Sequence, residues 1–118
     1  MFARNVLFLA LGAVASAQTF EGFPNSLTCN TGSGSATITK TEAQDAIVGP
    51  KGTKEDDSAA NTASGKCVTL SGIPLFSTGV SGKGTVGFAF DKGTNTYHFC
   101  FAQGAVDSSG YPSSCTEN

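Results

Sequence analysis

Four cysteines in a short chain place the tightest limit on how this protein can fold. The sequence has 118 residues, and the cysteines are Cys29, Cys67, Cys100 and Cys115. An even number of cysteines in a short secreted chain is typical of a disulfide framework, and four cysteines allow three pairings. There is no Cys-x-x-Cys pair and no cysteine–histidine cluster with zinc spacing. We therefore expect two disulfides, no metal and no cofactor.

The first seventeen residues, MFARNVLFLALGAVASA, have the features of a secretory signal peptide. Arg4 gives a positive start, the apolar run that follows is too short for a membrane span, and Ala15-Ser16-Ala17 fits a cleavage site. An N-terminal membrane anchor is the alternative. The sequence predicts that residues 1–17 are removed and that residues 18–118 form one secreted domain.

The charge of the mature chain argues against nucleic acid as its partner. Cleavage would remove Arg4, the only arginine, and take the formal charge from −2 to −3. Affinity for nucleic acid comes mainly from clustered lysines and arginines that neutralise phosphates. A protein partner is therefore favoured over RNA. No apolar run after residue 17 is long enough to span a membrane, so a membrane is not expected as a partner.

One short helix is predicted at about residues 40–48, within TKTEAQDAIVGP. Thr39 and Glu42 have the spacing of a capping box, Gly49 suits a left-handed position after the helix, and Pro50 follows it. Only small or medium apolar residues line this helix, so it must pack against something larger.

The segment 49–66, GPKGTKEDDSAANTASGK, has no periodicity and predicts a long surface loop. Its acidic cluster lacks the alternating oxygen ligands of a calcium loop. A solvated loop is therefore favoured over a metal site, and its charged residues are candidates for binding a partner: Lys54, Glu55, Asp56 and Asp57.

The strongest β signal is a hairpin, TVGFAFD and TYHFCFA joined by KGTN. The loop length predicts three pairs, and alternation places all six side chains on one face, which we expect to be the core. These pairs are Phe90 with Tyr97, Phe88 with Phe99, and Val86 with Phe101.

His98, the only histidine, then lies on the second face of the hairpin, opposite Ala89 and beside Cys100. Histidine is the most frequent general acid or base, so His98 is the candidate catalytic residue. A structural role on a half-exposed strand is the favoured interpretation.

Two stretches make the chain similar to a known family: TCNTGSGSATITKTEAQDAI and TVGFAFDKGTNTYHFCFAQGAVDSSGYPSSC. The order of an early cysteine, a capped helix, a polar segment, strands and a last cysteine resembles small secreted fungal ribonucleases of the T1/F1/U1 type. It is more similar still to non-catalytic ribonuclease-like effectors of plant-associated fungi. The resemblance implies a microbial-ribonuclease-like fold.

The catalytic set of that family is not intact in this chain. The family uses a glutamate, two histidines and an arginine on its sheet. Here Ala102-Gln103-Gly104 stand where Thr-His-Thr would be, and Glu42 and Glu55 are assigned to the helix and the loop. The resemblance therefore implies a scaffold that has lost catalysis. A weak ribonuclease using His98 with Lys66 or Lys83 is the alternative.

These observations predict an α+β domain with one short N-terminal helix packed on an antiparallel sheet. The favoured disulfides are Cys29–Cys115 and Cys67–Cys100, with Cys29–Cys67 and Cys100–Cys115 left open. The favoured function is a secreted, effector-type, non-catalytic binding module that uses loops 49–66, 77–84 and 103–114, the last containing Tyr111. A cell-wall-associated structural protein is a second alternative.

Overall fold

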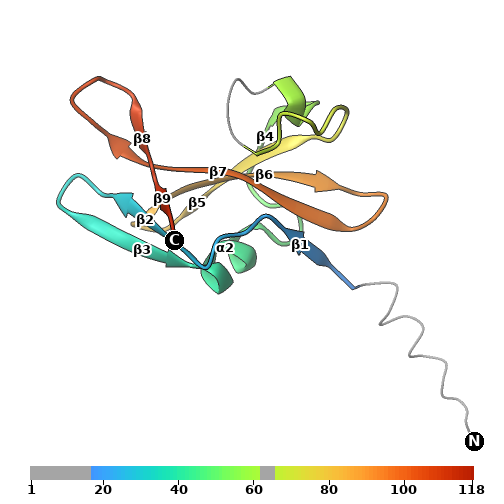
Figure 1. Ribbon diagram of the computed structural model, residues 1–118, viewed down its shortest axis with the longest axis horizontal. Coiled ribbons are helices and arrows are strands. Elements are labelled where there is room, and N and C mark those ends of the chain that lie inside the picture. The colour runs from blue at the N-terminus through green and yellow to red at the C-terminus, as the bar shows by residue number, and fades with distance from the viewer. Residues whose placement is uncertain (1–16, 62–65) are drawn as a thin grey trace, which may run out of the picture.

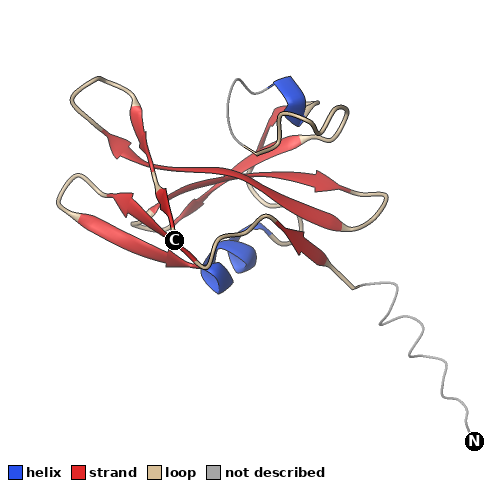
Figure 2. Cartoon of the chain, viewed as in Figure 1, coloured by secondary structure: helices blue, strands red, loops and turns tan. Residues whose placement is uncertain are grey.

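The structure is a computed structural model that describes residues 17–61 and 66–118, and it has an α+β fold (Figures 1 and 2). One α-helix, α2 (Lys40–Ile47), and one 3-10 turn, η1 (Ala59–Asn61), occur in the described part. The larger sheet contains β1 (Thr19–Glu21), β4 (Thr53–Asp56), β5 (Leu75–Val80), β6 (Gly84–Asp91), β7 (Thr96–Val106) and β8 (Pro112–Ser114). The smaller sheet contains β2 (Ser26–Asn30), β3 (Ser35–Thr39) and β9 (Thr116–Glu117).

The larger sheet is mixed, because one of its strands runs parallel to its neighbour. The prediction of a purely antiparallel sheet is therefore wrong for that strand. Its order is β1-β7-β6-β5-β4, with β8 also paired to β7. All these pairs are antiparallel except β1, which runs parallel to β7 with Phe20 opposite Tyr97 and Glu21 opposite His98. The strand β1 has three residues, which is too few to show the alternation that identifies a strand in a sequence.

The β6–β7 hairpin has two of the three predicted pairs. Phe90 lies opposite Tyr97 and Phe88 opposite Phe99, as expected, and His98 lies opposite Ala89. A bulge beyond Phe88 then shifts the register. The third predicted pair, Val86 with Phe101, is therefore wrong.

The bulge moves Phe101 to the opposite face of the sheet. Val86 pairs with Ala102, and Phe101 lies opposite Gly87 instead. An extra residue in one strand reverses the side-chain alternation beyond it. A Cβ atom on Gly87 would lie 2.3 Å from the Phe101 ring, so this close approach requires glycine.

The main core lies between the larger sheet and a layer formed by α2 and the smaller sheet (Figure 1). Ala43 and Ile47 of α2 are buried there against the aromatic face of the hairpin. The capping box of Thr39 and Glu42 is present, as predicted. Gly49 has a φ of 92°, and its N–H donates to the Tyr97 hydroxyl at 2.9 Å, which ties the end of α2 to β7.

A second, smaller cluster lies on the other face of the larger sheet. It buries Ala59 and Cys67, from the segment that follows β4, against three residues of the sheet: Leu75, Ala89 and Cys100. The disulfide Cys67–Cys100 fastens this segment to β7, and the second disulfide, Cys29–Cys115, joins β2 to the C-terminal region. The favoured pairing is confirmed, and the alternative left open is wrong.

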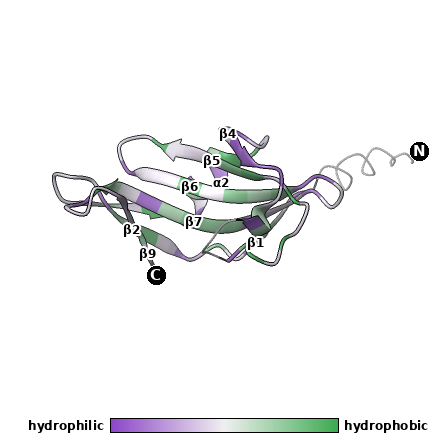
Figure 3. Cartoon of the chain, turned by 90° about the horizontal axis from the view of Figure 1, so that it is seen from above, coloured by the Kyte–Doolittle hydropathy of each residue, from purple (hydrophilic) through white to green (hydrophobic). Residues whose placement is uncertain are grey.

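The prediction of one continuous loop over 49–66 is wrong. Its first half contains the edge strand β4, which pairs with β5, and the turn η1. All four residues of β4 are polar, as its hydrophilic colouring in Figure 3 shows, so no apolar alternation marks it. Charged side chains on an edge strand also hinder pairing with another chain. The predicted loop also includes residues 62–65, which lie outside the described residues.

The predicted signal peptide, residues 1–17, lies almost wholly outside the described residues, because the structure describes the chain from residue 17 onward. Within residues 17–61 and 66–118, no helix has the length and apolar character needed to cross a membrane.

Candidate functional site

His98 lies on the second face of β7, where the hairpin pattern placed it. Its side chain is 19% exposed, and its Nδ1 lies 3.5 Å from Oε1 of Glu21 on β1. Both residues line a small pocket of about 160 Å³ together with Lys66. The pocket therefore brings together a carboxylate, an imidazole and an ammonium group.

Lys66, one of the two lysines considered as a partner of His98, lines the same pocket, but its ammonium group is already engaged. Its Nζ lies 2.8 Å from Oε1 of Glu117 and 3.0 Å from the carbonyl oxygen of Gly22. It also lies 5.3 Å from the centre of the Phe99 ring. These contacts leave less of its charge for a phosphate that entered the pocket.

Lys83, the other predicted partner of His98, belongs to a different part of the molecule. Its Nζ lies 2.7 Å from Oε2 of Glu42, and it lines a separate pocket at the turn between β5 and β6. The structure therefore brings Lys66 to His98 and leaves Lys83 elsewhere.

Glu21 is a residue that the sequence interpretation missed. The assignment of Glu55 to a loop is also wrong, because Glu55 belongs to β4, and Glu21 and Glu117 belong to β1 and β9. Glu21 reaches His98 only through the parallel pairing of two strands far apart in the sequence. A short parallel edge strand leaves no local signal for such a contact.

Three carboxyl groups have lowered pKa values, and each has a local structural cause. The pKa of Glu42 is lowered mainly by the hydrogen bond from Lys83, and that of Asp56 by the backbone N–H of Ser58. The pKa of Asp107 is lowered mainly by the hydroxyl of Ser109. Hydrogen bonds that favour the ionised form explain all three directions. These carboxylates fix a helix start and two turns.

The four predicted binding residues from Lys54 to Asp57 do not form one surface. Asp56 accepts hydrogen bonds from Ser58 and Asn61 within its own turn, and Asp57 pairs with Lys54 at 2.7 Å. Lys54 and Glu55 line pockets of their own on opposite faces of the larger sheet. Strand alternation in β4 is the cause of this separation.

Tyr111 lies near the tip of the β7–β8 hairpin and is 73% exposed. Val106, which pairs with Pro112, is 60% exposed beside it. The tip is held by Asp107, whose N–H donates to the Tyr111 carbonyl and whose carboxylate accepts from Ser109. An exposed aromatic side chain is thus presented on a hydrogen-bonded turn.

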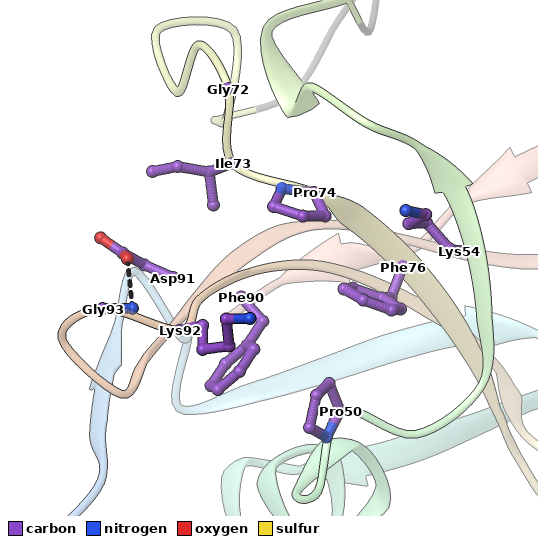
Figure 4. A pocket seen from close by; sticks show the side chains of 10 residues that line it. All are labelled: Pro50, Lys54, Gly72, Ile73, Pro74, Phe76, Phe90, Asp91, Lys92 and Gly93. Carbon is purple, nitrogen blue, oxygen red and sulfur yellow. Dashed lines mark hydrogen bonds between the residues drawn. The ribbon is translucent and has the colours of Figure 1, made fainter.

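Figure 4 shows a cleft that the sequence interpretation missed, lined in part by the turn between β6 and β7. This turn lies at the opposite end of the larger sheet from the β7–β8 tip (Figure 1). The cleft has a volume of about 420 Å³. Its apolar wall is formed by Phe76 and Phe90, which lie side by side in Figure 4, with Ile73, Pro74 and Pro50 around them. We call it the Phe76–Phe90 cleft.

The aromatic wall of the cleft is supported from behind by core side chains. The Phe76 ring stacks on Phe88 with centroids 5.4 Å apart, and the Phe90 ring packs on Tyr97 at 4.6 Å. Rings held in this way keep their orientation without a ligand. Lys54, Lys92 and Asp91 add charged groups at the edge of the cleft.

The cleft exists because α2 is too short to cover the whole aromatic face of the larger sheet. The helix ends at Ile47, and Phe76 and Phe90 are only partly buried. The sequence did contain a signal for an uncovered aromatic surface, because a helix with few, small apolar residues cannot cover a row of aromatic side chains. The residues that close the cleft come from segments without a periodic pattern, so its shape could not be predicted.

Comparison of the chain with protein-family models, with curated proteins and with solved structures found no match. The resemblance to T1/F1-type ribonucleases therefore stays a prediction.

Proposed function

We propose that this chain is a secreted, non-catalytic binding module that recognises another protein through the Phe76–Phe90 cleft. The observation that carries the proposal is the cleft itself, a preformed apolar recess with two supported aromatic rings and a few charged groups. Concave, mostly apolar pockets with a small number of polar groups are the usual form of a binding site.

The chemistry of the cleft fits an apolar side chain of a partner protein. An aromatic or aliphatic anchor would bury the exposed parts of Phe76 and Phe90, and Lys54, Lys92 and Asp91 would pair with charges around it. Interfaces of this kind draw most of their affinity from a few anchors in supported pockets. Tyr111 is the second contact in this proposal, at the other end of the molecule.

Secretion and an effector-type role are part of the proposal. Support for secretion comes from the leader-like residues 1–17 and from two disulfides, which persist in oxidising compartments. The effector-type role rests on the resemblance to degenerate ribonuclease scaffolds, on which recognition loops vary while the disulfide-bonded core is kept.

The experiment that tests the cleft is a fragment screen followed by two-dimensional NMR on oxidised residues 18–118. We expect small aromatic fragments to shift resonances of the cleft residues. Lys92→Glu should weaken the binding of anionic fragments. The matched control is Lys40→Glu on the exposed start of α2, which should leave the binding of the fragments unchanged. The proposal is wrong if no fragment binds or if the shifts lie elsewhere.

A weak ribonuclease remains the second candidate because Glu21, His98 and Lys66 line one pocket. In such an enzyme Glu21 and His98 would move protons and Lys66 would stabilise the negative charge on phosphorus. Lys66 would first have to leave Glu117, and no arginine is present after the leader. This candidate is therefore placed second.

A further inference from the structure

A second recess lies on the face of the larger sheet opposite the Phe76–Phe90 cleft. Its volume is about 280 Å³, and the buried side chain of Leu75 is part of its lining. Because alternate side chains of β5 point to opposite faces, Phe76 faces the cleft and Ser77 faces this recess. We call it the sheet-face recess, and its remaining lining residues are Glu55, Ser77, Thr85, Phe101 and Gln103.

Phe101 forms an aromatic surface at one side of the sheet-face recess. Three atoms of its ring would lie 2.3–2.7 Å from a Cβ atom on Gly87, so the ring lies directly on the backbone of β6. The bulge in the hairpin places it there. The side chain is only partly buried, so part of the ring is open to a ligand.

The polar groups of the recess come from four neighbouring strands and offer both donors and acceptors. Glu55 of β4 accepts a hydrogen bond from the Ser77 hydroxyl of β5 at 2.5 Å. Thr85 of β6 and Gln103 of β7 are direct cross-strand neighbours. A carboxylate, two hydroxyls and one amide can together hydrogen-bond several hydroxyl groups of a ligand.

Among the residues that the structure describes, no positively charged side chain lines the recess. Lys54 lines the cleft on the other face, and Lys83 pairs with Glu42. Phosphate groups need such charges, and Glu55 would repel them. The ligand that fits this lining is therefore neutral and rich in hydroxyl groups.

Gly79 borders the recess without lining it, because it pairs with Thr85 and follows Ser77 by two residues on the same face of β5. Four glycines lie in strands of the larger sheet, and three of them have close neighbours that a Cβ atom would strike: Gly84, Gly87 and Gly104. Gly79 has no positive φ, and a Cβ atom there would meet nothing within 4 Å. A strand glycine without a bulge or close packing is typical of a place where a ligand approaches the backbone.

We propose that the sheet-face recess binds a neutral oligosaccharide of β-linked pyranose units. The weakly positive axial C–H groups of one sugar unit would stack on the electron-rich face of Phe101. Its hydroxyls would donate to Glu55 and exchange hydrogen bonds with Gln103, Thr85 and Ser77. This site does not depend on the proposed protein-binding function, because the two sites lie on opposite faces and share no residue.

The test is a titration of oxidised residues 18–118 with laminarihexaose, cellohexaose and chitohexaose, followed by two-dimensional NMR. We expect saturable binding of at least one of them with a dissociation constant on the order of 0.1–1 mM, as is usual for a shallow site. The shifts should centre on Ser77, Thr85 and Gln103. Glu55→Gln and Gln103→Ala should each weaken binding by about tenfold.

The matched control is Thr37→Ala, an exposed polar residue of β3 in the smaller sheet, which should leave the affinity unchanged. A thermal melt of each variant separates loss of binding from loss of fold. The proposal is overturned if none of the three hexasaccharides binds, or if binding survives both recess substitutions. It is also overturned if a short RNA binds this face in place of the saccharides.

Discussion

At the scale of single residues, Gly87 is a position of the hairpin where an added side chain would strike an aromatic ring. We expect Gly87→Ala to destabilise the protein by about 1–3 kcal/mol, because the added methyl group must displace the Phe101 ring. Urea unfolding of both proteins at the same pH measures the difference in the free energy of unfolding.

Gly79→Ala is the control for this prediction. The new methyl group meets nothing, so the variant should be neutral or more stable by up to about 1 kcal/mol, through lower entropy of the unfolded chain. Equal effects at the two positions would contradict the placement of Phe101 over Gly87.

Single residues also show where sequence reasoning succeeded and where it failed. Tyr97 on the core face and His98 opposite Ala89 follow from alternation in one strong hairpin. Phe101 was misplaced because a bulge has no apolar signature. Glu21 was missed because its contact with His98 depends on a parallel strand pair formed across the whole chain.

At the scale of elements, α2 is connected to the sheet at both ends. Its start is held by the capping box and by the ion pair of Glu42 with Lys83, and its end by the hydrogen bond to Tyr97. The helix was predictable because capping, periodicity and termination signals agreed over a dozen residues. The edge strands β1 and β4 were not, since each is too short or too polar to show a period.

The Glu42–Lys83 connection makes a prediction for the pH dependence of stability. The folded-state pKa of Glu42 lies below 4.5, so its contribution is complete above that pH and is lost as the pH falls through the folded-state value. Glu42→Gln should therefore be less stable than the wild type at neutral pH, and this difference should shrink in acid.

Thermal melts of both proteins at a series of pH values measure this difference. Asp56 and Asp107 are present in both proteins, so the effects of their lowered pKa values on stability cancel in the difference. A stability difference that stays constant from neutral pH to well below 4.5 would show that the Glu42 carboxylate does not carry the connection.

At the scale of the whole molecule, the two disulfides close loops of very different length. The sequence separation is 86 residues for Cys29–Cys115 and 33 for Cys67–Cys100. On the chain-entropy account these bonds contribute about 4.6 and about 3.8 kcal/mol. Replacing both cysteines of the first pair by alanine should therefore cost roughly 1 kcal/mol more than the same change in the second.

Guanidinium unfolding of the two double-alanine variants measures these costs. A larger loss of unfolding free energy on removing Cys67–Cys100 would mean that this disulfide acts mainly by holding the segment after β4 against the second cluster. The entropy account would then be the wrong explanation for this pair.

The whole molecule presents different chemistry on the two faces of one sheet. The aromatic face continues past α2 and forms the Phe76–Phe90 cleft, while the other face carries the His98 pocket and the polar sheet-face recess. Both faces stay partly uncovered: α2 and the smaller sheet do not span the aromatic face, and the segment after β4 covers only part of the other face.

The most direct test of the account is cleavage of total RNA by oxidised residues 18–118, measured beside His98→Ala. The account predicts that neither protein cleaves RNA above the level of a buffer control. Lys66 is held by Glu117, and the described residues that line the pocket include no second histidine and no arginine. Cleavage by the wild type that disappears in His98→Ala, with an unchanged thermal melt, would contradict it. The Glu21–His98–Lys66 pocket would then be an active site.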